Sequence, residues 1–392
     1  MRAAYPSARG GKRAGEPART PRDTAALVRV QIVDPSAFTP PYDRALCAAL
    51  VRAGAQVELL TSRFSYGPVS PPEGYGVRES FYRWAPGAPG SRARLAAKLA
   101  QHVPDMLALR RHGAQADVVH FQWLSVQPLD VHLLPRLRPV ALTAHDVLPR
   151  EPRRGQLEAQ KRLYERVDAV VVHSEHGRAR LRDELGIDSE KLHVIPHGAF
   201  DHLTRPACAV PLPPELAAVQ KPVVLLFGLM RPYKGIDVAL EAWRGIEDAE
   251  LWIVGRPRMD IGALRAAAPP GVRWVPRFVA DEEIPAYFRR ADLVLLPYRE
   301  IDQSGVLFTA LAFGRPLLLS DVGGFPELAA TGAAELVPPA DPSALHAAIT
   351  RLLADAPARE RLAAAARAAA AGPYAWDAIA QRTLFLYTTL TS

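Results

Sequence analysis

The sequence predicts an α/β protein with two Rossmann-like, doubly wound domains that face each other across a cleft. Short apolar stretches rich in Val, Leu and Ile alternate with helix-length segments along most of the chain. This is the pattern of parallel strands covered on both faces. The alternation is interrupted by a proline-rich stretch over residues 198–221 and then restarts. Since 392 residues exceed what one ordinary core holds, the two βαβ series indicate two domains.

The apolar stretches place the strands and hence the domain limits. Expected strands lie at residues 26–34, 56–62, 117–123, 139–146 and 169–174, and then at 222–228, 249–255, 272–278, 292–298 and 316–321. We therefore expect an N-terminal domain over residues 25–200 and a C-terminal domain over residues 201–375. A last helix over residues 376–392 has a broad apolar face, which we expect to pack back on the N-terminal domain. Packing on its own domain is the simpler alternative.

Composition limits the classes of partner. Residues 1–24 hold six basic and two acidic residues, so this stretch, which we expect to be disordered, supplies +4 of the net charge of +7. The rest is only mildly basic, and we expect no nucleic-acid partner. No apolar run is long enough for a bilayer span, and the N-terminal stretch lacks the apolar centre of a signal peptide. Cys47 and Cys208 lack metal or redox spacing, which favours buried thiols in the cytoplasm.

A basic loop follows the first strand of the second series, in "VVLLFGLMRPYKGIDVALEAW". The strand ends at Gly228, Arg231 and Lys234 lie in the loop, and Gly235 opens an amphipathic helix. Ligands of open α/β sheets bind at this edge, beyond the carboxyl ends of the strands. Two cations there suit a diphosphate, although a solvated turn without a ligand would show the same charges.

The stretch "PYREIDQSGVLFTALAFGRP" predicts a second part of such a site. If a helix begins near Ser304, the backbone N–H groups of Ser304, Gly305 and Val306 have no acceptor within the helix and face the same sheet edge. Gly305 has no side chain, so a ligand could approach the backbone closely. A tight turn that needs glycine for its conformation is the alternative.

Several segments together resemble the retaining GT-B glycosyltransferases of family 4. They are "FGLMRPYKG", "DLVLLPY" and "QSGVLFTALAFGRPLLLSDVGGFPEL", with "HVIPHG" resembling the end of the family's first domain and "YAWDAIAQRTLFLY" its closing helix. The resemblance implies a nucleotide-diphosphate sugar as donor and no other cofactor. Arg231, Lys234 and the amides of residues 304–306 would bind the diphosphate, next to Gly228.

The chain departs from the family pattern at the donor sugar. Many members carry two Glu residues at the positions that are Ile301 and Thr309 here, so this chain resembles a branch with a "QSGV" turn. We expect the sugar's hydroxyls to be bound by Gln303, Asp302 or Glu300, in that order.

In the N-terminal domain, "ALTAHD" matches the family's strand that ends in a histidine at the cleft. The resemblance places His145 near the reacting centre, although a lone histidine after a strand is often structural. We expect His120, Gln122 and Trp123 to line the acceptor side, Trp123 by stacking on a sugar, with a core-edge aromatic as the alternative. We expect Tyr42 on the acceptor side as well, where it follows two prolines in place of the glycine-rich loop of many members.

We therefore expect transfer of a sugar to a hydroxyl of a sugar, a lipid-linked sugar or a small molecule, with retention of anomeric configuration. The chain has no Asp-x-Asp, so we expect no metal. The alternatives are a nucleotide-sugar epimerase, a phosphorylase or a non-catalytic binding protein; a dehydrogenase is disfavoured because no Gly-x-Gly-x-x-Gly follows a strand. Basic residues at 150, 153, 154, 161 and 162 could contact an anionic membrane at its inner face, but a solvated helix face is the better interpretation.

Overall fold

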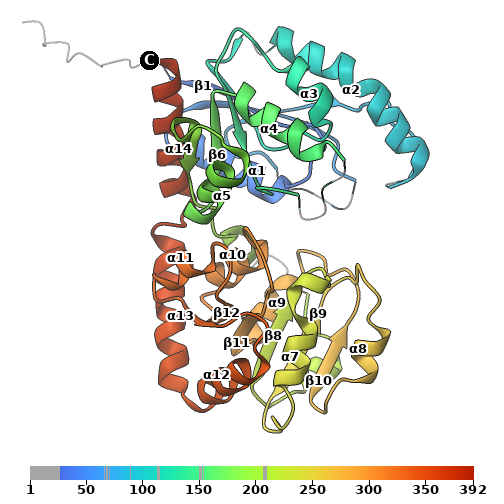
Figure 1. The fold of residues 1–392 in the computed structure, drawn as a ribbon, viewed down its shortest axis with the longest axis vertical. Helices are drawn as coiled ribbons and strands as arrows, with labels where there is room; N and C mark the ends of the chain where they lie inside the picture. Colours follow the sequence, from blue (N-terminus) through green and yellow to red (C-terminus); the bar gives the residue numbers. More distant parts are fainter. Residues whose placement is uncertain are drawn as a thin grey trace, which may run out of the picture.

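The computed structural model describes residues 27–392, apart from residues 66, 68, 70, 89, 113–114, 150–151, 153 and 206–209. The basic stretch over residues 1–24, Cys208, Arg150 and Arg153 therefore lie outside the described residues. The chain forms two α/β domains, one above the other in Figure 1, each built around a parallel sheet. The predicted fold class is confirmed.

The N-terminal sheet has seven strands in the order β3-β2-β1-β4-β5-β6-β7. Most of these strands are buried along almost their whole length, which explains their near-continuous apolar sequence. The strands are β1 (Arg29–Asp34), β2 (Gln56–Ser62), β3 (Gly76–Phe81), β4 (Val118–Phe121), β5 (Val140–Thr143), β6 (Ala169–Val172) and β7 (Leu192–Val194). The helices between them are α1 (Pro40–Arg52), α2 (Arg92–His112), α3 (Gln127–Leu133), α4 (Gln156–Arg166) and α5 (Glu175–Leu185), with the 3₁₀ turn η2 (Ser189–Lys191).

The C-terminal sheet has six strands in the order β10-β9-β8-β11-β12-β13. They are β8 (Val223–Phe227), β9 (Glu250–Val254), β10 (Val272–Val275), β11 (Leu293–Leu296), β12 (Leu317–Ser320) and β13 (Ala334–Val337). The helices are α6 (Pro214–Ala217), α7 (Ile236–Ala242), α8 (Gly262–Ala266), α9 (Ile284–Arg290), α10 (Gly305–Ala312), α11 (Phe325–Ala329), α12 (Pro342–Ala354), α13 (Ala356–Ala371) and α14 (Trp376–Thr391), with the 3₁₀ turns η3 (Asp201–Thr204) and η4 (Pro232–Lys234).

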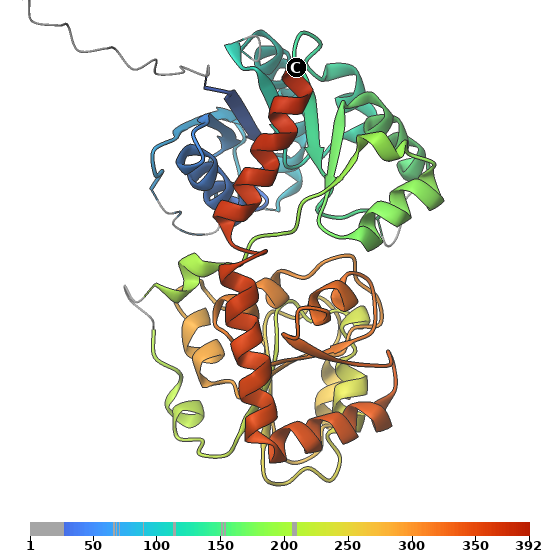
Figure 2. The ribbon, with the colours of Figure 1, turned by 90° about the vertical axis from the view of Figure 1, so that its left-hand side faces the viewer.

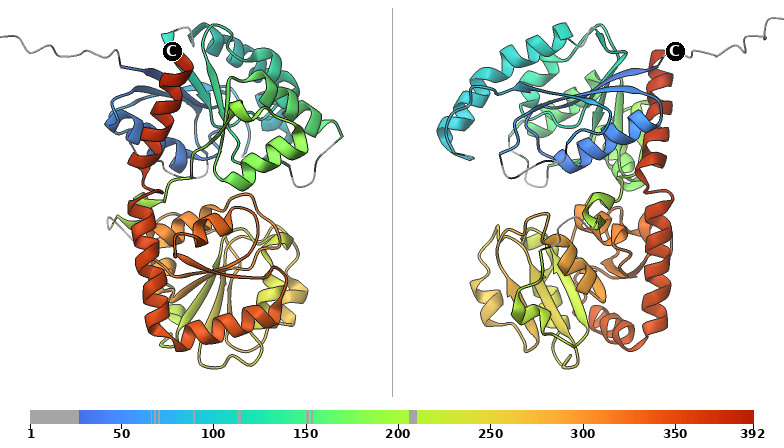
Figure 3. Two further views of the ribbon diagram at one scale, coloured as in Figure 1. Left: turned by 60° about the vertical axis from the view of Figure 1, so that its left-hand side comes forward. Right: turned by 180° about the vertical axis from the view of Figure 1, so that it is seen from behind.

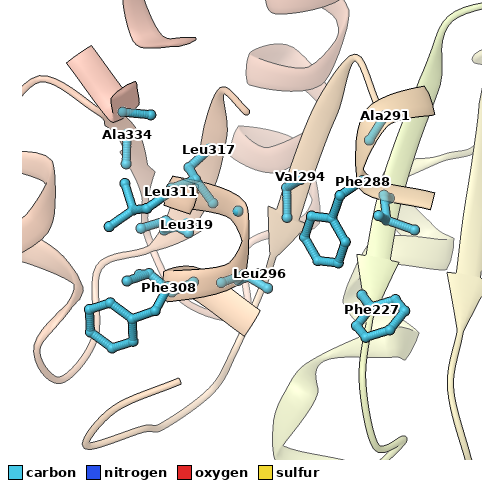
Figure 4. Close-up of a cluster of buried hydrophobic side chains, with 14 of the residues drawn as sticks. Phe227, Phe288, Ala291, Val294, Leu296, Phe308, Leu311, Leu317, Leu319 and Ala334 are labelled. Carbon is cyan, nitrogen blue, oxygen red and sulfur yellow. The ribbon is translucent and has the colours of Figure 1, made fainter. Parts of the chain in front are cut away.

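Each sheet is packed on both faces, so the molecule has four apolar clusters. In the C-terminal domain one cluster joins the sheet to α9, α10 and α13, and Figure 4 shows Phe288 and Phe308 lying over Val294 and Leu296 of β11. The other cluster lies under α7 and α12. Burial of both faces holds the strand ends, and the loops that follow them, in fixed positions.

Two segments join the domains, and they contact each other. The backbone N–H of Ala199 donates to Tyr374 O at 2.9 Å, and Trp376 Nε1 donates to Ala199 O at 2.7 Å. A Cβ on Gly198 would lie 2.5 Å from the Trp376 ring, so the ring packs directly on the backbone. Figures 2 and 3 show α13 beside the C-terminal domain and α14 continuing along the N-terminal domain.

The last helix, α14, completes the N-terminal core. Its buried side chains share an apolar cluster with α1 and the face of the sheet around β1 and β4. Arg52 of α1 forms an ion pair with Asp377 at 2.6 Å, and Tyr387 OH lies 2.6 Å from His120 Nδ1. The end of the chain is thus a structural part of the domain formed by its beginning.

Candidate active site

The loop after β8 is folded tightly against the neighbouring strand ends. Gly228 has φ +103°, and a Cβ there would lie 3.1 Å from Lys234 Nζ and 3.0 Å from Val306 Cγ2. Gly235 has φ +64°, and a Cβ there would lie 2.0 Å from Pro297 O. Both positions require glycine, because the left-handed conformation and the close approach exclude a side chain. The loop therefore brings Lys234 beside the start of α10.

The ammonium group of Lys234 is buried in this corner. The residue is 5% exposed, and Nζ donates to Tyr298 OH at 2.8 Å. Tyr298 OH in turn lies 3.4 Å from Ser304 Oγ. Tyr298 thus gives the buried cation a polar partner and connects it to Ser304 at the start of α10. Lys234 and the N-terminus of α10 therefore form one electropositive centre.

Helix α10 begins at Gly305 with Ser304 as its N-cap, which confirms the predicted helix start. No side chain caps this end and no acidic residue lies in its first turn, so the partial positive charge of the helix N-terminus is not neutralised locally. Gly305 is exposed, and a Cβ there would meet only the Phe200 ring, at 3.5 Å. An anion can therefore approach the amides of Ser304, Gly305 and Val306.

Described residues of both domains line two adjoining cavities. The first, of about 1710 Å³, is lined by Gln122, Trp123 and His145 of the N-terminal domain and by Arg231, Arg299 and Glu300 of the C-terminal domain. The second, of about 1150 Å³, is lined by residues of the β1–α1 loop and α2 on one side and by Leu229, Arg256 and Phe278 on the other. Phe38 and Arg258 line both, so the cavities adjoin.

His145 lies at the head of a hydrogen-bonded chain of side chains. Its Nε2 is 3.1 Å from Gln122 Oε1, and its Nδ1 is 3.2 Å from His173 Nε2. His173 Nδ1 is 2.9 Å from the carbonyl oxygen of Ile195. Trp123 stacks on the His145 ring with centroids 5.0 Å apart, so one face of the indole is not available to a sugar. The predicted stacking role of Trp123 would need its other face or edge.

The chain of hydrogen bonds fixes the protons on both histidines. Burial lowers the pKa of His173 to about 4 and holds the pKa of His145 well below its usual value, so both rings are neutral at pH 7. Because Ile195 O only accepts, His173 Nδ1 carries the proton and its Nε2 accepts from His145 Nδ1–H. His145 Nε2 then holds a lone pair and needs a donor. The amide of Gln122 meets this need when its NH₂ group faces His145, which also gives a partner to the otherwise unpaired Gln122 Nε2.

The structure does not bring His120 or Tyr42 to either cavity. His120 is 1% exposed and lies between Tyr387 OH and Thr143 Oγ1, at 2.6 and 2.8 Å, so it ties α14 to two strands. Tyr42 is buried with its ring edge against His145, with centroids 4.7 Å apart. Gln122 and Trp123 do line the first cavity. Two of the four residues expected on the acceptor side therefore line a cavity.

Comparison with known proteins connects this geometry to a family. Residues 44–199 match the model "Glycosyltransferase Family 4", and residues 221–355 match the model "Glycosyl transferases group 1". The two matches together cover more than half of the chain, with one match in each domain. The chain belongs to the family 4 glycosyltransferases.

Relatives of this family 4 glycosyltransferase include one that matches most of its length and one that matches a little over half. It is 28% identical over 389 residues to a D-inositol 3-phosphate glycosyltransferase of Xylanimonas cellulosilytica, covering 89% of this chain and 91% of the relative. It is 31% identical over 242 residues to a phosphatidyl-myo-inositol mannosyltransferase of Mycobacterium leprae, covering 58% and 61%.

Solved structures show the same GT-B fold. A sucrose-phosphate synthase of Thermosynechococcus elongatus has a TM-score of 0.72 at 22% identity, covering 93% of this chain and 99% of that one. An Anabaena protein, HepE, in complex with UDP and glucose, has a TM-score of 0.70 at 19% identity, covering 92% and 100%.

In this family 4 glycosyltransferase, two residues of the turn before α10 contact the N-terminal domain. Asp302 is 6% exposed and accepts from Arg180 Nη1 at 2.8 Å, and Gln303 Nε2 donates to His173 O at 3.3 Å. Both partners belong to the N-terminal domain. Of the three candidates for contact with the donor sugar, only Glu300 lines one of the two cavities.

Sequence reasoning missed several residues of the site. Tyr298 holds Lys234, and Arg258 lines both cavities. Each follows a strand next to β8, as Tyr298 follows β11 and Arg258 follows β9. The sequence therefore did contain a signal for both residues, because each is a polar residue shortly after a strand that neighbours β8.

Two searches of the structure found nothing in the part of the chain that it describes. None of the described His, Cys, Asp and Glu residues form a group of three or more that could hold a metal ion. Among the described helices, none combines the length and the apolar character needed to cross a bilayer.

Proposed function

We propose that this glycosyltransferase takes a sugar from a nucleotide-diphosphate donor and transfers it to a hydroxyl group with retention of anomeric configuration. The observation that carries the proposal is the meeting of Lys234 with the N-terminus of α10 across Gly228. Lys234 and the start of α10 do not themselves line either cavity, but Arg231 of the same loop lines the first. A buried cation beside the amides of a helix N-terminus suits a diphosphate that is leaving from a sugar.

The diphosphate would lie across three groups of donors. Lys234 supplies a fixed charge, and the amides of residues 304–306 supply hydrogen bonds. Arg231 is exposed and lines the first cavity, from which its guanidinium could bind the second phosphate bidentately. These groups would balance the charge of the leaving group without a divalent metal ion, and we infer that none is needed.

His145 would act toward the substrate through its Nε2 lone pair. Both ring nitrogens already have partners, since Nδ1 lies 3.2 Å from His173 Nε2 and Nε2 lies 3.1 Å from the side-chain amide of Gln122. A substrate hydroxyl could take the place of Gln122 by donating to Nε2. His145 would then orient the donor sugar near the reacting carbon, and Glu300 is the carboxylate on the opposite wall of the cavity that could bind its other hydroxyls.

The acceptor would enter from the N-terminal side of the cavities. The names of the relatives indicate inositol phosphate and a phosphatidyl-inositol as their acceptors, so we infer a polyol, a sugar or a lipid-linked sugar. Lys161 and Arg162 of the basic cluster pair with Glu165 and Glu158 along α4, as a solvated helix face does, and we do not extend the proposal to membrane contact. Cys47 is a free buried thiol, which fits a cytoplasmic location.

Nucleotide binding tests the donor assignment. UDP, GDP, UDP-glucose and GDP-mannose are added to the protein, and the unfolding temperature is measured. A ligand at 100 times its Kd should raise it by about 5–10 °C, from roughly 2.7 kcal/mol of linkage. Lys234→Ala should abolish the shift, whereas Lys221→Ala, an exposed lysine of the same domain, should retain it. If the unfolding temperature of Lys234→Ala rose as much as that of the wild type, Lys234 would not bind the nucleotide.

A transfer assay separates the reaction from its alternatives. Once a donor is found, release of the nucleoside diphosphate should require an added acceptor and should continue in excess EDTA. Donor turnover without an acceptor would instead indicate an epimerase or a hydrolase. Loss of activity in EDTA with recovery on adding Mg²⁺ would contradict the role given to the cations.

A further inference from the structure

The corner between β6 and α5 of the N-terminal domain contacts the C-terminal domain at the turn before α10 and at α11. Arg180 Nη1 of α5 donates to Asp302 Oδ1 at 2.8 Å, and the carboxylate is almost fully buried. The carboxylate of Glu327, in α11, accepts from the backbone N–H groups of Glu175 and His176, both at 2.9 Å. Glu327 thus neutralises the N-terminus of α5 from the other domain.

A third contact lies beside these two. Gln303 Nε2 donates to the carbonyl oxygen of His173 at 3.3 Å, and a Cβ on Gly324 would lie 3.1 Å from Ser174 Cβ. His173 is also the partner of His145. The contacts therefore link the turn of one domain to the histidine chain of the other.

The position of Asp302 and Gln303 gives these contacts a consequence for the donor site. Both residues immediately precede Ser304, whose N–H is the first of the three amides at the start of α10. Without Arg180, Asp302 would be a buried carboxylate lacking its cation, which is costly enough for the turn to rearrange. The direction of the amides thus depends on a residue of the opposite domain.

We propose that Arg180 is a positioning residue for donor binding. By holding Asp302 it fixes the turn that presents the amides of residues 304–306, so the anion site is complete only when the two domains are closed. This inference rests on the proposed function, since it concerns the site assigned above to the diphosphate. Closure would then be coupled to nucleotide binding, because the nucleotide binds the closed form more tightly.

Arg180 also provides its own control. Its Nε donates to Glu184 Oε1 at 2.7 Å within α5, independently of the other domain. Glu184→Gln removes this local pair and leaves Asp302 in place. Arg180→Gln and Asp302→Asn each remove the pair between the domains, and Arg180→Lys keeps the charge.

The experiment measures affinity and shape in the full chain. Calorimetric titration with UDP, and with GDP in parallel, gives Kd, while small-angle scattering gives the radius of gyration with and without nucleotide. We expect Arg180→Gln and Asp302→Asn each to weaken binding roughly 3- to 30-fold, with no further loss in the double variant. Arg180→Lys should recover part of the affinity, and Glu184→Gln should bind as the wild type does. The two weakened variants should remain more extended when saturated.

Several results would overturn the inference. They are an unchanged Kd in Arg180→Gln, additive losses in the double variant, or the same loss in Glu184→Gln. A purely structural role would lower the unfolding temperature without changing the Kd of the folded protein. If the wild type bound neither nucleotide, the donor assignment itself would fail. Scattering would then test whether the Arg180–Asp302 pair holds the domains together. The same radius of gyration in Arg180→Gln and wild type would refute that role.

Discussion

Substitution of Gly235 by alanine should damage both the stability of the C-terminal domain and its binding of nucleotide. Gly235 lies in the left-handed region at φ +64°, directly after Lys234. A Cβ there would lie 2.0 Å from Pro297 O, a backbone atom that no side-chain rotation can move away. The β8–α7 loop would have to shift, and Lys234 would shift with it.

The magnitude follows from two separate costs. The left-handed conformation costs an alanine about 1–2 kcal/mol, and relief of the clash adds about 1–3 kcal/mol. Gly245→Ala isolates the first cost, because Gly245 has φ +82° and a Cβ there would meet nothing within 4 Å. At roughly 2–4 °C per kcal/mol, we expect Gly245→Ala to lower the unfolding temperature by about 4 °C and Gly235→Ala by about 10 °C.

Thermal unfolding with and without UDP measures both effects on the same samples. Gly245→Ala should retain the full nucleotide shift, and Gly235→Ala should lose most of it. Equal unfolding temperatures for the two variants would refute the steric argument. If Gly235→Ala were strongly destabilised but UDP raised its unfolding temperature as much as that of the wild type, the loop conformation would not determine the position of Lys234.

Three further predictions concern the titration of buried side chains and the contact of Trp376 between the two segments that join the domains. Burial lowers the pKa of His120 and His197 to about 3 and of His173 to about 4, so below about pH 6.5 the unfolded chain binds protons that the folded chain does not. Each of these histidines should therefore lower the free energy of unfolding by about 2 kcal/mol at pH 5. The measurement is the unfolding temperature, which should fall between pH 7 and pH 5. Burial, with Asp34 nearby, raises the pKa of Asp43, so stability is lost as pH rises from the unfolded pKa of about 4 towards the raised one; Asp43→Asn should remove this loss, and its advantage over wild type in urea unfolding should grow as pH rises above about 4. Trp376→Ala should cost about 3–5 kcal/mol, because the ring packs on Gly198 and donates to Ala199 O; an unchanged denaturation midpoint would contradict the role of this contact.

The strands were predictable because burial on both faces leaves a near-continuous apolar run, which few other structures produce. The basic loop and the start of α10 were predictable for the same reason, since each follows such a strand. The histidine chain was not recognised, although its signal was present. His145 and His173 each follow one of two neighbouring parallel strands, β5 and β6, and parallel strands bring such residues to one edge.

The roles of Asp302 and Gln303 could not be predicted, because their partners belong to the other domain. No local pattern specifies which helix of one domain will meet a given turn of another. His120 illustrates the same limit: its position near the end of β4, after Val118 and Val119, suggested a cavity, but its partner Tyr387 lies at the far end of the chain.

The packing of α14 has a consequence for the order in which the protein is made. The strands of the N-terminal sheet leave the ribosome first, but the helix that covers one face of that sheet, with Ile379, Leu386 and Tyr387, leaves last. Until then His120 lacks its hydroxyl partner and the apolar face is open to water. The N-terminal domain therefore gains this helix only after the whole C-terminal domain has been synthesised, and in the interval its exposed apolar face is the kind of surface on which folding intermediates aggregate.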